Sequence, residues 1–345
     1  MVVRVCVNGI GTIGKRIAHA VKLQDDMKLA AISTTSASYT LRTLLEPDGP
    51  LYGTDLWCSV PEKIKAMRDA GMYVNGTLEE LLDSGKIDIV IDCTPEGIGL
   101  QNKSMYQKYG VKAIFQGGEK AGVGEMTFSP FVNYQDALGK NYVRVPSCNT
   151  TSLIRTLNVL DKLAGIESVF ATIIRRASDP ADTEKTIMNT IEPTTTVPSH
   201  HGPDVQTVLK HINIKTMAFK VPTTLAHVHA INAKVKGNVK KDDLEEAFVK
   251  NTRIILVSAD QGYKTTATVI ERFRDLCRPR NDMPEVAVWK ETIAVDDSNV
   301  YWSHMVHQES IVIPENIDCI RAMCNIEKDP WTSIKKTNKS LGLKN

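Results

Sequence analysis

The sequence has few of the features that mark secreted, membrane or nucleic-acid-binding proteins. Its seven cysteines are an odd number, and no two are spaced as C-x-x-C, so no disulfide framework is indicated. The 42 Lys and Arg residues exceed the 40 Asp and Glu residues by only two, which gives no field to attract nucleic acid or a membrane surface. No apolar run approaches the roughly 18 residues that cross a bilayer, and the N-terminus does not resemble a secretory signal. We therefore expect a cytoplasmic protein that binds neither nucleic acid nor membrane.

The length and composition indicate two globular domains. The chain has 345 residues, of which 42% are hydrophobic, enough to build sizeable cores. Its first half alternates short apolar runs with helical stretches, which is typical of a parallel βαβ sheet. The expected strands lie at 2–7, 27–33, 87–92, 111–115 and 142–145.

The second half has a different pattern. Leu153, Leu157 and Leu160 mark an amphipathic helix, and longer apolar runs follow at 167–175, 214–221, 225–235, 252–258 and 285–307. The last run contains Asp296–Asn299, a turn that would join two strands of a hairpin. Long strands with hairpin connections predict a mixed or antiparallel sheet covered by helices.

A glycine-rich turn follows the first predicted strand. Residues Gly9, Gly11 and Gly14, with Thr12 and Ile13 between the last two, match G-x-G-x-x-G between a strand and a helix. The first glycine permits a tight turn, the second a close approach of pyrophosphate, and the third close helix packing. An ordinary glycine turn is the alternative, but the strand and helix on either side favour dinucleotide binding.

The second predicted strand does not end in an acidic residue. NAD-specific domains usually carry an acid there to bind the ribose 2′-hydroxyl, whereas this chain has Ser33–Ser36. Hydroxyl groups do not repel a 2′-phosphate, so the sequence predicts that NADP is accepted as well as NAD. The alternative is that these four residues only form a polar loop.

One cysteine differs from the others in its position. Cys148 lies between a predicted strand and a predicted helix, where a helix N-terminus is expected to stabilise the thiolate and lower the pKa of the thiol. Position alone leaves a structural thiol equally open. A cofactor domain that ends at this thiol favours a nucleophile that adds to an aldehyde and lets hydride pass to nicotinamide.

Such a nucleophile needs a histidine partner. His227 and His229 share one face of a predicted strand, about 7 Å apart. No Cys or acid has ligand spacing to this pair, so no metal site is expected. His200 and His201 lie together in a polar loop, where they would either bind an anionic substrate or be solvated.

Taken together, these residues resemble the archaeal type of phosphorylating glyceraldehyde-3-phosphate dehydrogenase. The resemblance runs essentially end to end. Its most distinctive blocks are Val7–Arg16, Asp92–Gly97, Phe115–Lys120, Ser147–Thr151, Pro198–Asp204, Val221–Thr224 and His307–Ser310. Two positions depart from the family pattern: Ser152 stands where the family usually has glycine, and no lysine lies near the end of the second strand, which weakens a preference for NADP.

The resemblance implies an activity and a site. The activity is oxidation and phosphorylation of glyceraldehyde 3-phosphate to 1,3-bisphosphoglycerate, with reduction of NAD or NADP, in a cytoplasmic homotetramer. Cys148 would be the nucleophile and His227 the base, with His229 as the alternative. Ser147, Asn149, His200 and His201 would contact the substrate. The cofactor would be bound by Gly9, Gly11, Thr12, Ile13, Gly14, Gly118, Arg176 and Gln308.

The fold expected from these patterns is α/β. Residues 1–147 would form a Rossmann-type dinucleotide-binding domain, and residues 148–308 an α+β catalytic domain with a mixed or antiparallel sheet. A C-terminal helix in residues 309–345 would pack back on the first domain. Two other functions stay open: a related cysteine-dependent semialdehyde or acyl-phosphate dehydrogenase, and a dinucleotide-sensing protein without catalysis.

Overall fold

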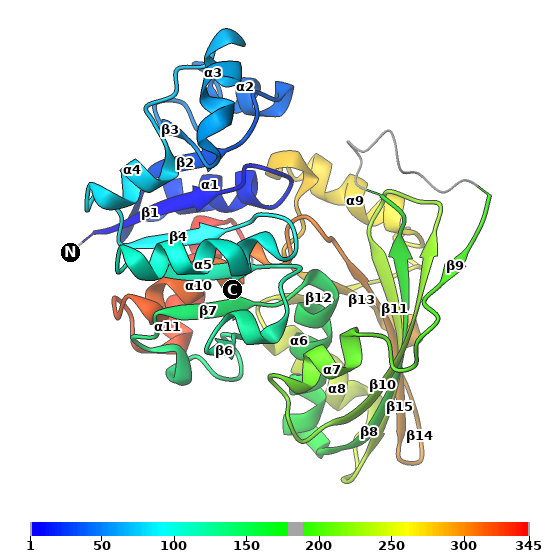
Figure 1. Ribbon diagram of the computed structural model, residues 1–345. Coiled ribbons are helices and arrows are strands. Elements are labelled where there is room, and N and C mark those ends of the chain that lie inside the picture. Colours follow the sequence, from blue (N-terminus) through cyan, green and yellow to red (C-terminus); the bar gives the residue numbers. More distant parts are fainter. Residues whose placement is uncertain (1, 179–188, 344–345) are drawn as a thin grey trace. The chain divides into compact units, whose positions relative to one another are not determined.

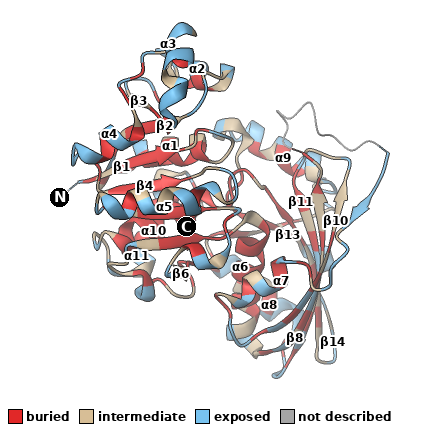
Figure 2. Cartoon of the chain, in the orientation of Figure 1, coloured by how far each residue is buried: buried red, intermediate tan, exposed pale blue. Residues whose placement is uncertain are grey.

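The computed structural model describes residues 2–178 and 189–343. The chain divides into two compact units. The first unit consists of Met1–Ser147 and Ile313–Gly342, and the second consists of Cys148–Val312 and Leu343–Asn345 (Figure 1). Buried residues concentrate on the sheet strands and their covering helices within each unit (Figure 2). In the part of the chain described, no helix combines the length and the apolar character needed to span a membrane.

The first unit is built on a seven-stranded sheet in the order β3-β2-β1-β4-β5-β7-β6. Every pair of neighbouring strands is parallel, as the alternating pattern predicts. The strands are β1 (Val3–Asn8), β2 (Met27–Thr34), β3 (Asp55–Cys58), β4 (Ile89–Asp92), β5 (Lys112–Gln116), β6 (Met126–Thr127) and β7 (Tyr142–Val145). All five predicted strands are present, with ends shifted by one or two residues. The short strands β3 and β6 were not predicted, because neither contains an apolar run long enough to indicate a strand.

Helices cover this sheet. They are α1 (Gly14–Lys22), α2 (Tyr39–Leu45), α3 (Ile64–Asp69), α4 (Leu78–Asp83), α5 (Ile98–Lys108), α10 (Ile313–Met323) and α11 (Pro330–Ser340). Short 3-10 turns lie at Pro61–Lys63, Ala121–Val123 and Gln135–Ala137. The segment after residue 309 holds two helices rather than the one expected. Asn325 takes a φ of 53°, and Asp329 Oδ2 accepts a hydrogen bond from the backbone N–H of Thr332 over 2.7 Å, so a new helix begins at Pro330.

The last two helices are tied to the start of the chain by a buried arginine. The Arg321 side chain, which is fully buried, lies 2.7 Å (Nε to Oδ2) from Asp26 just before β2. The same guanidinium donates to Gln24 Oε1 over 2.8 Å and to Thr337 Oγ1 over 2.6 Å. Helix α10 also contacts α1 and β5, so residues from the end of the chain complete the core of the first unit.

The second unit contains an eight-stranded sheet in the order β12-β13-β15-β11-β8-β10-β9, with β14 paired to β15. The pairs β8–β10 and β12–β13 are parallel and the other pairs are antiparallel, which confirms the predicted mixed sheet. The strands are β8 (Ile166–Arg176), β9 (Glu192–Pro193), β10 (Asn213–Val221), β11 (His227–Val235), β12 (Ile254–Val257), β13 (Val286–Trp289), β14 (Ala294–Asp296) and β15 (Asn299–Val306). The predicted hairpin turn joins β14 to β15, where Asp297 has a φ of 50°.

One face of this sheet carries helices and most of the buried side chains. The helices are α6 (Cys148–Ala164), α7 (His201–Gln206), α8 (Lys241–Lys250) and α9 (Thr266–Asp275), with 3-10 turns at Pro279–Asn281 and Lys290–Thr292. Along β11, His227, His229 and Ile231 are buried, and the residues between them are more exposed. This period-two alternation points both histidines to the same face of the sheet, and β11 and β15 both contact α6.

Candidate active site

The glycine turn of the first unit has the geometry of a phosphate-binding loop. Gly9 has a φ of +95°, and a Cβ on it would lie 2.8 Å from the carbonyl oxygen of Cys93. A Cβ on Gly14 would lie 1.8 Å from the Gly9 carbonyl oxygen, so the start of α1 packs on the turn only because no side chain is present. Gly11 instead faces open space, with no atom within 4 Å of its Cβ position. The middle glycine thus leaves room for a pyrophosphate, which fits a dinucleotide cofactor.

A buried polar cluster supports this turn. Asn8 and Asp92 are paired at the ends of the neighbouring strands β1 and β4. The Tyr106 hydroxyl donates to Asp92 Oδ2 over 2.6 Å and accepts from Asn8 Nδ2 over 3.1 Å. Asp92 Oδ1 accepts from the backbone N–H of Thr94 over 3.0 Å, which orders the loop after β4. This support was not predicted; the signal for it was an acid, Asp92, at the end of an apolar strand.

The end of β2 carries hydroxyl groups and no acid. Ser33 is buried, and its Oγ lies 2.7 Å from Ser59 Oγ, so this residue belongs to the packing of the sheet. Thr35 and Ser36 follow the strand and are exposed. Two of the four predicted hydroxyls are therefore placed where a ligand can reach them.

Gly118 lies in the loop after β5, near the start of α5. The next residue, Glu119, accepts hydrogen bonds from the backbone N–H groups of Gly97 and Gly99 over 2.8 and 2.9 Å. A pocket of about 650 Å³ is lined by Glu96, Gly97, Leu100, Glu119, Lys120, Gly122 and Val123. Gly118 adjoins it, because a Cβ on Gly118 would lie 3.3 Å from Glu96 Cβ.

Cys148 begins α6 in the second unit, but its thiol is not activated as the sequence suggested. Burial raises the pKa of Cys148 to about 11, because lost solvation outweighs the opposing effects of the Arg176 guanidinium and the Asn149 N–H. The expectation of a lowered pKa is therefore wrong for this structure. The helix N-terminus acts in the expected direction, but desolvation of the thiol is the larger effect.

Arg176 lies at the end of β8, beside this thiol. Its Nη2 is 3.3 Å from Glu309 Oε1, and both side chains are almost completely buried. His307 Nε2 approaches the other oxygen of Glu309 at 3.1 Å. The positive charge next to Cys148 is thus held in place by a buried carboxylate. The sequence analysis did not single out Glu309, although it belongs to the block His307–Ser310.

His227 begins β11, and its ring contacts the backbone of Arg176. The N–H of Arg176 donates to His227 Nδ1 over 3.0 Å, in a buried environment. The pKa of His227 is lowered well below its usual range. Burial of the ring is the largest cause, and the charge of the Arg176 guanidinium is the second. A hydrogen bond with the Gln308 side chain acts in the opposite direction. The neutral ring has its Nδ1 lone pair occupied, so its proton lies on Nε2.

His229 lies two residues further along β11, and both of its ring nitrogens have buried partners. Its Nε2 is 2.9 Å from Asn149 Oδ1, and its Nδ1 is 3.0 Å from His304 Nε2. Burial lowers the pKa of His229 well below its usual range. This ring is therefore held by neighbouring side chains on both of its nitrogens.

The histidine pair of the polar loop is split between an exposed and a buried ring. His200 is exposed, while His201 is buried and opens the short helix α7. The two ring centroids are 3.9 Å apart. His201 Nδ1 is 3.1 Å from Ser199 Oγ, and its Nε2 is 3.2 Å from Asn149 Nδ2. His201 supports the ring of His200 and contacts the residue that follows Cys148.

The second unit thus brings many of the predicted site residues together through direct contacts and charge interactions. Asn149 joins His201 to His229, and Arg176 affects the pKa of both Cys148 and His227. The predicted glycines of the turn, with Thr12, Ile13, Gly118 and Ser147, belong to the first unit. Among residues 2–178 and 189–343, no cluster of three or more His, Cys, Asp or Glu side chains is arranged to hold a metal.

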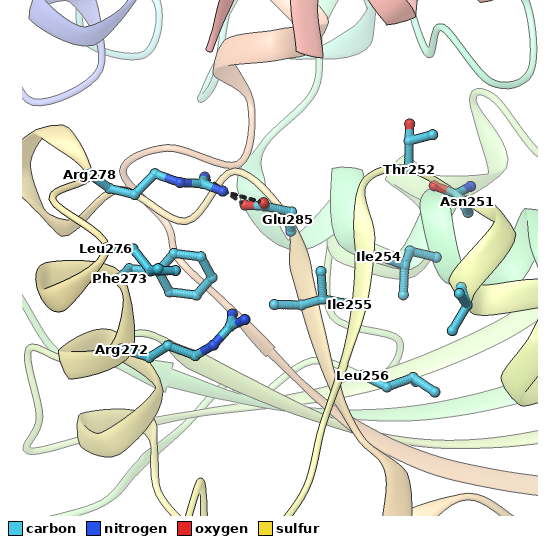
Figure 3. A pocket seen from close by; sticks show the side chains of 11 residues that line it. Asn251, Thr252, Ile254, Ile255, Leu256, Arg272, Phe273, Leu276, Arg278 and Glu285 are labelled. Carbon is cyan, nitrogen blue, oxygen red and sulfur yellow. Dashed lines mark hydrogen bonds and ion pairs between the residues drawn. The ribbon is translucent and has the colours of Figure 1, made fainter. Parts of the chain in front are cut away.

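A further pocket of the second unit involves none of the predicted site residues. It measures about 290 Å³ and lies between β12 and α9 (Figure 3). Ile255, Phe273 and Leu276 form apolar parts of its wall. At one side Arg278 Nη2 and Glu285 Oε1 form an ion pair of 2.7 Å. The guanidinium of Arg278 also lies 5.0 Å from the centre of the Phe273 ring. The residues on this side of the pocket therefore contact one another.

Comparison with known proteins gives a consistent result. A family model described as glyceraldehyde 3-phosphate dehydrogenase, C-terminal domain, matches residues 147–292. Glyceraldehyde-3-phosphate dehydrogenase of Methanobacterium bryantii is 48% identical over 339 residues, covering 98% of each chain. The proteins of the same name from Thermococcus kodakarensis and Pyrococcus furiosus are 48% and 49% identical over 343 residues, covering 99% of each chain.

Proposed function

Because the chain belongs to the glyceraldehyde-3-phosphate dehydrogenase family, we propose that Cys148 is the nucleophile with which it oxidises glyceraldehyde 3-phosphate in the presence of inorganic phosphate. The observation that carries this assignment is the common neighbourhood of one thiol, one arginine and one histidine. Arg176 lowers the pKa of Cys148 through its charge and binds His227 through its backbone N–H. Dinucleotide binding belongs to residues 1–147, and substrate chemistry to residues 148–308.

The cofactor is a nicotinamide dinucleotide, and the glycine turn fits it. The open space at Gly11 accommodates the pyrophosphate, and Thr12 and Ile13 lie beside it at the start of α1. The exposed hydroxyls of Thr35 and Ser36, with no acid at the end of β2, support acceptance of both NADP and NAD. A dinucleotide held by this turn would supply a nicotinamide ring as the acceptor of hydride from the substrate carbon. Gly118, Arg176 and Gln308 are proposed as further cofactor contacts.

The covalent steps take place on Cys148. Its sulfur forms a bond to the aldehyde carbon while the thiol proton is released to solvent and the carbonyl π pair moves to the oxygen, which gives a hemithioacetal with a negatively charged oxygen. After oxidation of that carbon, a thioester to Cys148 remains. An oxygen of inorganic phosphate then bonds to the thioester carbon, the carbon–sulfur bond breaks, and 1,3-bisphosphoglycerate leaves with the thiolate restored.

His227 is proposed to act on the substrate oxygen through Nε2. Since Nδ1 accepts the Arg176 N–H, the neutral ring carries its proton on Nε2 and donates it as a hydrogen bond. A donor in this position stabilises the negative oxygen of the hemithioacetal, as an oxyanion hole does. This role differs from the base expected from the sequence, because the only lone pair of the neutral ring is already in use.

The substrate phosphates need donors and cations. His200 is exposed and stacked on the buried ring of His201, so we assign direct phosphate contact to His200 and support of that ring to His201. Ser147 and Asn149 flank Cys148 and complete the substrate side of the site. Arg175, which also lowers the pKa of Cys148, supplies a second positive charge.

A homotetramer in the cytoplasm is proposed as well. The outer face of the second sheet exposes Phe170, at 44%, and brings together the half-buried side chains of Ile174, Phe219 and Val228 on three adjacent strands. An apolar sheet face of this kind supports association with further copies. All seven cysteines are unpaired, as expected in a reducing compartment.

One assay tests the activity and the cofactor together. Reduction of NAD and of NADP is followed with glyceraldehyde 3-phosphate, with and without inorganic phosphate. We expect reduction of both cofactors that depends on phosphate. Activity only with a semialdehyde substrate would identify the related dehydrogenase instead. Binding of dinucleotide without turnover would identify a sensing protein.

A further inference from the structure

A continuous chain of hydrogen bonds runs through the interior of the second unit and ends at both sides of Asn149. Its first member is Trp302 on β15, whose Nε1 lies 3.1 Å from His304 Nδ1. An indole N–H can only donate, so His304 accepts at Nδ1 and carries its own proton on Nε2. The direction of the first hydrogen bond is therefore fixed by the type of residue that begins the chain.

The direction passes from His304 to the residue after the nucleophile. His304 Nε2–H donates to His229 Nδ1 over 3.0 Å. His229 must then carry its proton on Nε2, which donates to Asn149 Oδ1 over 2.9 Å. Ser152 Oγ also lies 3.3 Å from His229 Nδ1, but its hydrogen is directed to the Asn149 carbonyl oxygen over 2.8 Å.

The opposite end of the chain accommodates the same direction. Thr216 Oγ1 lies 3.0 Å from the Ser199 carbonyl oxygen and 2.8 Å from Ser199 Oγ, and when it donates its one hydrogen to the carbonyl it accepts from Ser199 Oγ. Ser199 Oγ, its own hydrogen used, accepts from His201 Nδ1–H over 3.1 Å. His201 Nε2 then has a free lone pair and accepts from Asn149 Nδ2 over 3.2 Å.

The two ends meet at Asn149 without conflict. The His229 side requires an acceptor there and finds Oδ1, and the His201 side requires a donor and finds Nδ2. A flipped carboxamide would place Oδ1 against the His201 lone pair and Nδ2 against the His229 proton. To remove that conflict both histidines would have to change tautomer, and the Trp302 indole cannot follow because it has no acceptor.

Burial keeps every member of this chain in its neutral form. All the side chains from Trp302 to Thr216 are at most 3% exposed. Burial lowers the pKa of both His304 and His201 to about 3, and that of His229 well below its usual range. At this degree of burial, a donor or acceptor that lost its partner would not be exposed to solvent, so the arrangement that satisfies every member is strongly favoured.

We propose that Trp302, His304 and His229 are positioning residues that hold the carboxamide of Asn149, and through it the ring of His201, in a single orientation beside Cys148. None of the three needs to touch the substrate. Their effect on turnover rests on the proposed function, whereas the arrangement of protons does not. Asn149 is adjacent in sequence to the nucleophile, and His201 supports the ring assigned to the substrate phosphate. Misorientation of either is expected to slow the covalent step.

The proton arrangement is tested in the wild-type protein. The full chain is labelled with ¹⁵N-histidine, and solid-state NMR distinguishes protonated from unprotonated ring nitrogens among the eight histidines. At neutral pH we expect a proton on Nε2 of His304 and His229 and on Nδ1 of His201. The opposite tautomer at any of the three, or a charged ring, would overturn the proposal. Single His→Gln variants assign the signals.

The functional effect is tested with two variants of one residue. His304→Leu removes the donor to His229, and we expect kcat to fall by ~10-fold to 10²-fold, the scale of a small displacement of catalytic groups. In His304→Gln the side-chain NH₂ reaches the position of Nε2 and still donates, so most of kcat returns. Equal activity of the leucine variant and wild type, or equal loss in both variants, would overturn the proposal.

A surface histidine provides the control. His211 is exposed and lies 2.8 Å from Asp161, and His211→Gln is expected to keep the wild-type kcat. A wild-type protein that has the expected tautomers but no dehydrogenase activity would refute the proposed function and leave the positioning chain intact.

Discussion

The backbone N–H of Arg176 donates a 3.0 Å hydrogen bond to Nδ1 of His227, and this contact decides which nitrogen of the neutral ring carries the proton. With Nδ1 occupied, Nε2 carries the proton and acts as a donor. Removal of this donor in His227→Ala is expected to lower kcat by ~10²–10³, the usual loss for one oxyanion donor. His227→Gln keeps an N–H near the Nε2 position and should be at least ~10-fold more active than the alanine variant. Equal kcat values would indicate a base rather than a donor.

Cys148→Ser should abolish turnover without unfolding the protein. The hydroxyl replaces a thiol of similar size at the first position of α6, but an alcohol is a far weaker nucleophile than a thiolate. Cofactor reduction and thermal unfolding are measured on the same preparation. Cys277→Ser is the matched control, because Cys277 is exposed and lies outside the site. Substantial residual activity in the Cys148 variant would refute the assignment of the nucleophile.

The reactivity of the thiol should depend steeply on pH. Because burial raises the pKa of Cys148 to about 11, its alkylation by iodoacetamide in the free enzyme should rise ~10-fold per pH unit from neutral pH toward that value. Arg175→Gln removes a charge that lowers this pKa, so the variant should react more slowly at any fixed pH below 11. Lys220→Gln, a surface charge paired with Glu192, serves as the control. A rate that levels off near pH 7 would contradict the raised pKa of this thiol.

A single charge at the end of β2 should change the choice of cofactor. Thr35→Asp places a carboxylate where the structure has an exposed hydroxyl. Repulsion of the 2′-phosphate should raise the KM for NADP by ~10-fold or more, with much less effect on NAD. Thr35→Asn has nearly the same shape without the charge and should behave like the wild type. Parallel changes in both KM values would show that this position does not contact the ribose.

The stability of the second unit should fall in mild acid. The pKa values of His201 and His304 are lowered by burial to about 3, whereas an unfolded chain binds a proton on each near pH 6.5. Between these limits the unfolded state takes up more protons, so the free energy of unfolding decreases as pH falls. Each histidine contributes up to about 1.4 kcal/mol per pH unit.

Urea denaturation from pH 7 to pH 4 measures this dependence. His304→Gln has no group that titrates there, so its slope should be shallower than that of the wild type by as much as one histidine contributes. His211→Gln, at an exposed position, should retain the full slope. Identical slopes in all three proteins would mean that His304 is not held neutral by the fold.

Much of the fold follows from local sequence patterns. Apolar runs located the strands of both sheets, because a buried strand must be apolar over several consecutive residues. The glycine turn was recognisable because Gly9 and Gly14 leave no room for a Cβ, which restricts the residue type strictly. The division after Met323 was not predicted, since Cys324 continues the apolar spacing and only Asn325 and Pro330 mark the break.

The sequence singled out Cys148 as a candidate nucleophile but did not indicate its pKa or the partners of the candidate histidines. Cys148 stood out by position, but its pKa depends on how much protein surrounds the sulfur, which no local pattern records. The link from His304 to His229 spans 75 residues and exists because β11 and β15 pair with these two opposite each other. Sequence spacing along one strand could not reveal a partner supplied by another.

The composition of the first unit has a consequence for the order in which the protein is made. Residues 1–147 leave the ribosome early in translation. The partner of Asp26, Arg321, is synthesised 295 residues later. Residues 148–312 can emerge and fold in between, as one uninterrupted segment. The nascent sheet that begins the chain therefore spends most of translation without α10 and α11, and its apolar flank is exposed to chaperones until synthesis ends.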